Sequence, residues 1–144
     1  MLRQENTKKQ GDVGLGVAIG WLACNGYTVC VPLTDSQDYD LVADIDGLKK
    51  IQVKTTTYQV ASGSYSANLS VKGGNRTSRG NVKKFNGKKI DFLFVFTGDD
   101  TMYLIPTTKL ENEHSITLGK EYDKFRVGDD DGGVVTGCKP VPAG

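Results

Sequence analysis

Apolar residues recur at three- and four-residue steps across residues 7–25, a spacing that predicts one helix. One stripe of this helix consists of Val13, Val17, Trp21 and Cys24. Gly26 follows directly and predicts the end of the helix, because glycine readily adopts the backbone conformation found at helix C-termini. Gly16 and Gly20 each lower the helix propensity by about 1 kcal/mol, so we expect them to allow close packing of the helix against a sheet.

Further along the chain, shorter apolar runs predict strands. The predicted strands span residues 27–33, 39–45, 49–57, 65–72, 91–97 and 101–106. Asp46-Gly47 is a sequence typical of two-residue hairpin turns, so we expect it to join the second and third strands in antiparallel order. One helix followed by several strands predicts an α/β or α+β sheet with the helix on one face. Residues 81–89 are interpreted as a short helix or an ordered loop.

The length of 144 residues is typical of one domain. We expect this domain to span residues 1–128, and we expect residues 129–144 to form a flexible tail. No apolar run approaches the roughly 18–20 residues needed to cross a membrane, and the polar N-terminus lacks an apolar signal core. We therefore expect a cytoplasmic protein.

Charge is unevenly distributed along the chain, although the formal net charge is only +1. Residues 47–90 contain ten basic residues and no acidic residue. The segment before them has three basic against seven acidic residues, and the segment after them has five against ten. A concentrated basic segment is typical of a surface that binds polyanions, so we interpret it as a nucleic-acid-binding face. The alternative is a lysine-rich loop exposed to solvent.

Three polar side chains are predicted to converge near one strand end. Gln52 and Lys54 lie two residues apart in a strand and therefore point to the same face. The hairpin turn places Asp40 on the neighbouring strand, where the expected register sets it opposite Lys54 or Thr55. The alternative interpretation is a cross-strand ion pair of Asp40 with Lys54 on a solvated face, worth about 0–1 kcal/mol.

Such a set of side chains suits the hydrolysis of phosphodiesters. A carboxylate binds a hard divalent cation such as Mg²⁺ through oxygen, and the cation polarises the phosphate and helps to generate hydroxide. A nearby ammonium group orients the water or stabilises the extra charge of the transition state. The backbone carbonyl of Val53, between Gln52 and Lys54, is a further candidate ligand.

Four short segments carry a family pattern: Cys30-Val31-Pro32-Leu33, Tyr39-Asp40-Leu41, Ile51-Gln52-Val53-Lys54-Thr55 and Tyr103-Leu104-Ile105-Pro106. Together they resemble the PD-(D/E)XK nuclease superfamily, and more narrowly its group I intron homing endonucleases and their small relatives. The resemblance implies an α/β fold with a restriction-endonuclease-like core, which is a mixed β-sheet flanked by helices.

By this resemblance Asp40 is the motif aspartate, Lys54 is the motif lysine, and Gln52 occupies the position usually held by Asp or Glu. An amide oxygen coordinates a metal without adding negative charge, so we expect weaker Mg²⁺ binding unless another acid contributes. Relatives supply a glutamate from the first helix, but the position aligned with it here, Leu15, is apolar. Asp12 is the nearest acid in that helix, and its alternative role is an interaction with the helix dipole. The predicted metal ligands are Asp40, Gln52, Val53 and Asp12, with Mn²⁺ as an alternative to Mg²⁺.

The same resemblance gives the basic segment a role in binding DNA. Arg76 and Arg79 are the candidates for contacts to base edges, and the lysines are the candidates for contacts to phosphate. The predicted DNA-binding residues are Lys72, Arg76, Arg79, Lys83 and Lys84. His114, the only histidine, is interpreted as an isolated surface residue.

The sequence therefore predicts a Mg²⁺-dependent endonuclease that hydrolyses DNA at specific sites, in the manner of homing or restriction enzymes. Two alternatives stay open: a structure-selective nuclease similar to Holliday-junction resolvases, and a DNA-binding relative without catalysis. One small domain has one active site, so cutting both strands requires a homodimer or homotetramer. The apolar segment 91–106 is either part of the interface or buried within one chain.

Overall fold

The first helix forms where its sequence predicts it. The computed structural model describes Leu2 and residues 5–72, 82, 83, 85, 87, 89–112 and 114–128. In it, α1 spans Thr7–Cys24. The side chain of Asn6 caps the start of α1 by accepting hydrogen bonds from the backbone N–H groups of Lys8 and Lys9. Gly26 ends the helix with a φ of 84°, as predicted.

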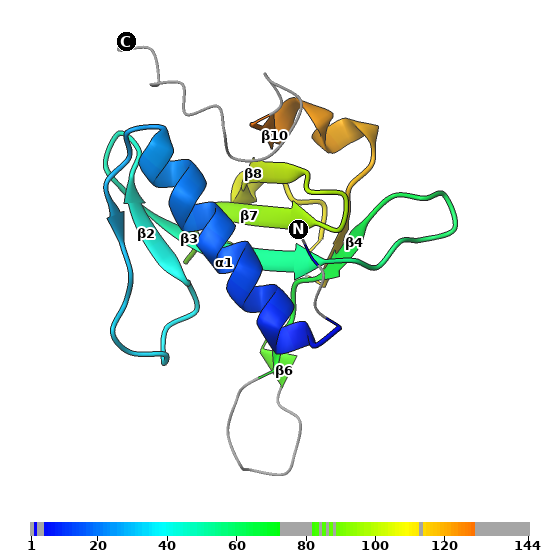
Figure 1. The fold of residues 1–144 in the computed structure, drawn as a ribbon, viewed down its shortest axis with the longest axis horizontal. Helices are drawn as coiled ribbons and strands as arrows, with labels where there is room; N and C mark the ends of the chain where they lie inside the picture. The colour runs from blue at the N-terminus through cyan, green and yellow to red at the C-terminus, as the bar shows by residue number, and fades with distance from the viewer. Residues whose placement is uncertain are drawn as a thin grey trace.

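A mixed six-stranded sheet forms the centre of the molecule (Figure 1). In spatial order its strands are β1 (Val29–Cys30), β2 (Leu41–Asp44), β3 (Leu48–Thr56), β7 (Phe92–Thr97), β8 (Met102–Pro106) and β10 (Arg126–Val127). β3 and β7 run parallel, whereas the other neighbours run antiparallel. The predicted α/β class with a mixed sheet is confirmed. The short strand β10 has no counterpart among the strands expected from the sequence.

Two separate two-stranded sheets and two 3₁₀ helices complete the described fold. β4 (Ser66–Asn68) pairs with β9 (Ser115–Thr117), and β5 (Val71–Lys72) pairs with β6 (Val82–Lys83). Two 3₁₀ helices, η1 (Thr107–Lys109) and η2 (Lys120–Phe125), follow β8 and β9. The expected strand 65–72 is therefore two short strands, and the segment 81–89 contributes a short strand. The predicted tail, residues 129–144, lies outside the described residues.

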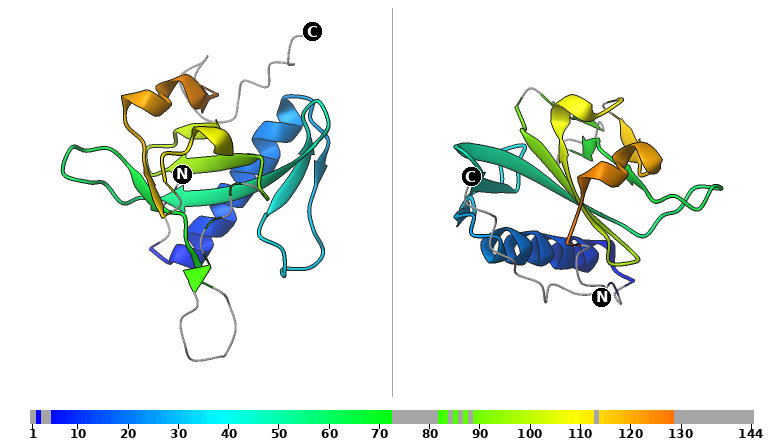
Figure 2. Two further views of the ribbon diagram at one scale, coloured as in Figure 1. Left: turned by 180° about the vertical axis from the view of Figure 1, so that it is seen from behind. Right: turned by 90° about the horizontal axis from the view of Figure 1, so that it is seen from above.

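Each face of the sheet carries its own apolar cluster. α1 covers one face, and the segment from β9 to η2 lies on the other, as the view from above shows (Figure 2). The cluster beneath α1 includes Val17, Ala18, Leu22, Leu41, Ile51 and Phe94. The opposite cluster includes Ala67, Leu93, Val95, Ile105, Ile116 and Tyr122. The β7–β8 hairpin contributes to both clusters, so the apolar residues of segment 91–106 are buried within one chain. No described helix has the length and apolar character that a membrane span requires.

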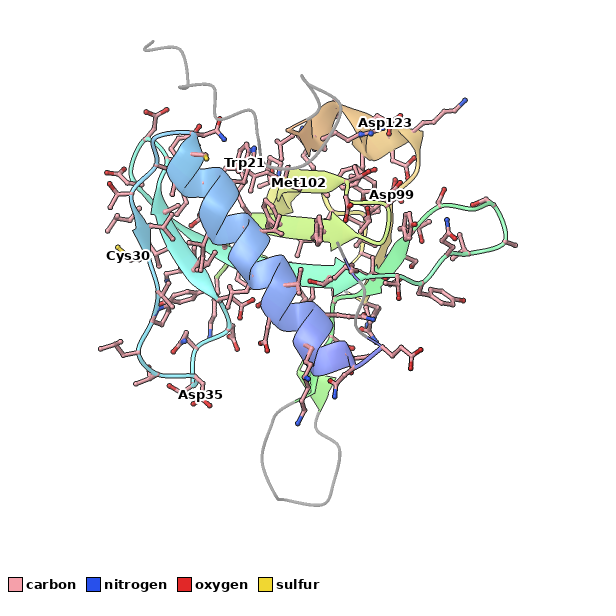
Figure 3. All side chains as sticks on the ribbon, viewed as in Figure 1. Trp21, Cys30, Asp35, Asp99, Met102 and Asp123 are labelled. Atoms are coloured by element: carbon pink, nitrogen blue, oxygen red, sulfur yellow. The ribbon has the colours of Figure 1, made fainter. Side chains whose placement is uncertain are left out.

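The helix packs closely against the sheet at Gly14. A Cβ placed on Gly14 would lie 1.8 Å from the Thr55 Oγ1 atom and 3.1 Å from the Thr55 Cβ atom. A Cβ on Gly16 would meet no atom within 4 Å, so the expectation that Gly16 allows close packing is wrong. Nearer the C-terminus of α1, Trp21 and Met102 lie on the same side of the sheet and in the same cluster (Figure 3).

Candidate active site

The register of the β2–β3 hairpin determines which polar side chains meet. Leu41 pairs with Ile51, so Asp40, one residue before β2, lies opposite Gln52. The expected register, which placed Asp40 opposite Lys54 or its neighbour, is wrong. Because directly opposed residues share a face of the sheet, Asp40 still lies on the same face as Gln52.

The turn of this hairpin sets the observed register. β2 ends at Asp44 and β3 begins at Leu48, so the turn holds three residues, 45–47, instead of two. Asp46 and Gly47 have φ values of 52° and 106°, and the Asp44 carboxylate accepts a hydrogen bond of 3.0 Å from the Gly47 N–H. The side chain of Asp44 thus stabilises a longer turn, which the Asp-Gly signature alone does not specify.

At Asp40 a side-chain oxygen, and not a backbone carbonyl, accepts the hydrogen bond from the backbone of β3. The Asp40 N–H donates to the Ile51 carbonyl at 2.9 Å. The next N–H of β3 on that edge belongs to Val53, and it donates to Asp40 Oδ2 at 2.9 Å. Gln52 Nε2 donates to the same oxygen at 2.8 Å. The Asp40 carboxylate is therefore fixed by two donors from β3.

Lys54 lies two residues beyond Gln52 on the same face and is half-buried. Burial lowers the pKa of Lys54, and the charge of Asp40 acts in the opposite direction. Burial also raises the pKa of Asp40, although the Val53 N–H and the charge of Lys54 oppose this change. Within the described part of the chain, the Lys54 ammonium has no hydrogen-bond or ion-pair partner. Two ionisable groups partly withdrawn from water and not directly paired are typical of a functional site rather than of a solvated ion pair.

The helix and the polar cluster lie on opposite faces of the sheet. Ile51 and Val53 face the cluster beneath α1, whereas Gln52 and Lys54 alternate with them and project from the other face. Asp12 is an exposed residue of α1. Among the described residues, no three His, Cys, Asp or Glu side chains gather where they could bind a metal. Hydrogen bonds thus bring Asp40, Gln52 and Val53 together, and the role of Asp12 as a metal ligand stays a prediction.

Asp40, Gln52 and Val53 together form a cluster that we call the fork. The oxygen atoms of the fork suit a hard cation. The second carboxylate oxygen of Asp40 accepts no hydrogen bond from the described residues, and no buried polar side-chain atom there lacks a partner. This oxygen therefore reaches solvent. A residue in a strand directs its N–H and C=O to the same side, so the Val53 carbonyl also faces the β2 edge. Together with the Gln52 amide oxygen, these are oxygen ligands of the kind that Mg²⁺ prefers, with a single negative charge.

An open cleft of about 690 Å³ extends from Lys54 across the same side of the protein. Residues 54–56 and Tyr58 line one wall, and residues 66–68, Ser70 and residues 114–115 line the other. His114 is exposed, as the sequence predicts, but it lies in this cleft and is not isolated.

This second wall of the cleft was not predicted from the sequence. Its signal was the alternation of polar Ser66, Asn68 and Ser70 with the buried residues Ala67 and Leu69, which is the pattern of a strand with one exposed polar face. What the alternation could not show is that the polar face lies beside Lys54.

The predicted DNA-binding residues lie next to the cleft or outside the described part of the chain. Ser70 lines the cleft, and the β5–β6 ribbon begins at the next residue. This ribbon projects away from the rest of the protein, below β4 in Figure 1. Lys72 belongs to β5 and Lys83 to β6, but their side chains are not described. Outside the described residues lie Arg76, Arg79 and Lys84.

Comparison with known proteins identifies the class to which this fold and site belong. Residues 5–126 match a family model described as PD-(D/E)XK endonuclease, and because this match covers most of the chain, the protein belongs to that family. Its structure is similar to that of a bacterial homing endonuclease, I-Ssp6803I, with a TM-score of 0.67 and 28% sequence identity over 80% of this chain and 79% of the other. No curated protein matches the sequence. The predicted family resemblance and the restriction-endonuclease-like fold are both confirmed.

Proposed function

We propose that this protein is a divalent-metal-dependent endonuclease that hydrolyses DNA phosphodiester bonds at specific sites. The observation that carries the proposal is the fork at Asp40, where the carboxylate accepts hydrogen bonds from Gln52 and Val53 and lies near the partly buried, unpaired Lys54. Membership of the PD-(D/E)XK endonuclease family and the similarity to a homing endonuclease support it.

Each residue of the fork has a distinct role in this proposal. Asp40, Gln52 and the Val53 carbonyl would hold Mg²⁺ or Mn²⁺, which when bound supplies a polarised phosphate and an acidified water. In this structure the Gln52 amide nitrogen donates to Asp40. To bind the cation, the amide would rotate by about half a turn so that its oxygen points to the metal. Lys54 donates hydrogen bonds to the phosphate or to the attacking water and offsets the charge that develops in the transition state. Asp12 stays a prediction as the second carboxylate.

Binding and assembly complete the proposal. The basic segment, through Lys72, Arg76, Arg79, Lys83 and Lys84, contacts the DNA. One fork per chain cuts one strand, so cleavage of a duplex requires a homodimer or homotetramer. The apolar β7–β8 hairpin is buried within the monomer, which leaves other surfaces for the interface.

The first test compares two aspartates of the same hairpin. Asp40→Asn keeps the shape of the side chain and an oxygen that accepts from Val53, but it removes the negative charge. We expect it to reduce the nicking of supercoiled plasmid in Mg²⁺ by more than about 100-fold, because the charge that holds the cation is lost. Asp44→Asn is the matched control, since Asp44 also accepts a backbone N–H but lies at the other end of β2, beside the turn. It should cut as the unmodified protein does.

The same assay separates the alternative functions. A synthetic four-way junction is incubated beside the plasmid, with EDTA as the metal-free control. Cleavage of the junction without cleavage of the plasmid identifies a resolvase-like enzyme, and DNA binding without cleavage of either substrate identifies a non-catalytic relative. If Asp40→Asn nicks plasmid at the unmodified rate, Asp40 is not part of the active site.

Asp40→Asn should also raise the melting temperature at pH 7. Burial raises the pKa of Asp40 in the folded protein, so the folded state binds more protons than the unfolded state between the ordinary and the raised pKa. The contribution of Asp40 to stability therefore falls as the pH rises through that window, and it is unfavourable at neutral pH. Thermal melts of both proteins should differ at pH 7 and converge below the ordinary pKa of aspartate.

Gln52→Glu tests why an amide stands at this position. A second carboxylate replaces the Nε2 donor to Asp40 and places like charges side by side, which destabilises the protein without metal. It also adds the negative charge that an amide lacks, so Mg²⁺ binding strengthens. We expect a lower melting temperature than that of the unmodified protein in EDTA and a larger increase on addition of Mg²⁺.

Gln59→Glu is the matched control for Gln52→Glu. Gln59 also donates through Nε2, to the Gly63 carbonyl, but it is exposed in the β3–β4 loop. Its replacement removes one hydrogen bond and adds one charge away from the fork. If both variants respond to Mg²⁺ equally, the Gln52 position does not bind the cation.

A further inference from the structure

The residues that line the cleft beside Lys54 are mostly of polar types, and none of those described is acidic. Hydroxyl, amide and imidazole side chains dominate its walls, and Ala67 is the one aliphatic residue among them. Neutral hydrogen-bond donors without a carboxylate suit an anionic ligand, because no charge in the wall repels it.

The hydrogen bonds around the cleft leave specific donors free to bind a ligand. Asn68 uses Oδ1 to accept from the backbone N–H and the hydroxyl of Ser70, and its amide nitrogen has no acceptor among the described residues. The backbone of His114 is fixed at both ends, by Asn112 Oδ1 and by the Leu69 N–H. These contacts fix the Asn68 side chain and the backbone of His114, and they leave the Asn68 amide nitrogen and the His114 ring available to a ligand in the cleft.

The cleft also connects two parts of the protein that a DNA strand would meet. Lys54 and Ser70 both line it, and Ser70 directly precedes β5, which carries Lys72. A strand whose scissile phosphate lies at Lys54 and whose neighbouring region contacts the basic ribbon must cross this cleft.

We propose that the cleft binds the DNA backbone flanking the scissile phosphate, with Asn68 and His114 donating hydrogen bonds to its phosphate oxygens. This inference rests on the proposed nuclease function, because that function places the phosphate at Lys54. It assigns to Asn68 and His114 a role in holding the substrate, and none in the chemical step.

The test measures DNA binding separately from cleavage. Binding of a fluorescein-labelled duplex of arbitrary sequence is followed by anisotropy in EDTA at about 0.15 M salt, where charges more than about 8 Å apart are largely screened. Asn68→Asp keeps the Oδ1 acceptor for Ser70 but replaces the amide donor with a negative charge. We expect its Kd to rise about tenfold or more, and that of His114→Ala to rise about fivefold.

Asn112→Asp is the matched control. Asn112 also accepts two backbone N–H groups through Oδ1, so the variant keeps the same capping role and gains the same charge, but it does not line the cleft. We expect its Kd to change less than twofold.

The outcomes distinguish this inference from the proposed function. The proposal for the cleft is wrong if Asn68→Asp and Asn112→Asp have equal effects on Kd. It is also wrong if Asn68→Asp binds DNA normally in a protein that still nicks plasmid. Either result leaves the proposed nuclease function intact. Weakened binding by Asn68→Asp in a protein that never nicks plasmid with Mg²⁺ supports the cleft and overturns the nuclease. Absence of DNA binding by the unmodified protein overturns both.

Discussion

Lys54→Met is expected to lower the rate of DNA cleavage at saturating substrate by about 100- to 1000-fold, the range found when one transition-state donor is removed. Methionine keeps the length and apolar stem of the side chain but cannot donate a hydrogen bond or carry charge. Single-turnover nicking of supercoiled plasmid in Mg²⁺ measures the effect. Substrate binding should change little, because this ammonium acts mainly on charge that develops in the transition state.

The same substitution is expected to raise the melting temperature by a few degrees. Burial lowers the pKa of Lys54 in the folded protein, so the unfolded state binds more protons between the lowered and the ordinary pKa. Stability of the unmodified protein should therefore rise with pH through that window. The advantage of Lys54→Met should be largest at neutral pH and shrink as the pH approaches the ordinary pKa of lysine.

Lys109→Met is the control for Lys54→Met. It makes the same chemical change at an exposed lysine of η1, where neither cleavage nor stability should change appreciably. If the nicking rate of Lys54→Met is within threefold of the unmodified rate, Lys54 takes no part in the chemical step. A lower melting temperature would contradict the view that burial of this charge opposes folding.

The second large effect is expected at Gly14, where alanine should destabilise the fold by about 2 kcal/mol or more. The new methyl group would meet Thr55 Oγ1 at 1.8 Å and Thr55 Cβ at 3.1 Å. Rotation of the threonine moves the oxygen but not the Cβ, so α1 must shift away from β3. The gain in helix propensity from replacing glycine, about 1 kcal/mol, does not offset this clash. Urea unfolding measures the difference.

Two further variants isolate the cause of this effect. Gly16→Ala, in the same helix but with no atom within 4 Å of the added Cβ, should stabilise the protein by up to about 1 kcal/mol. Gly14→Ala combined with Thr55→Ala should lose less stability than the two single changes together, because the hydroxyl is gone while the Cβ contact stays tight. Additive effects would show that the clash with Thr55 is not the cause.

The position of the catalytic candidates shows how far a short motif determines a site. The alternation of residues in β3 was sufficient to place Gln52 and Lys54 on one face, since the side-chain period of a strand is fixed. The partner of Asp40 was not predictable in the same way. Asp44 pairs with Leu48 across a three-residue turn, which sets Asp40 opposite Gln52 and not Lys54, and a capping contact from Asp44 holds that turn.

The cleft and Gly14 of α1 are features that depend on contacts between residues distant in sequence. His114 reaches the cleft because β9 pairs with β4, some fifty residues earlier. Nothing near His114 in the sequence carries that information. Gly14 and Gly16 look alike in the sequence, yet only the direction in which α1 packs decides which of them meets Thr55.

The sequence by itself determined the long helix, most of the strands, the family and the polar residues of β3, because local periodicity and a short motif encode them directly. The tertiary structure alone decided the pairing of Asp40 with Gln52, the separation of the site from the face covered by α1, and the wall of the cleft. These depend on turn length, register and long-range strand pairing, whose free energies arise from contacts between residues that no local pattern links.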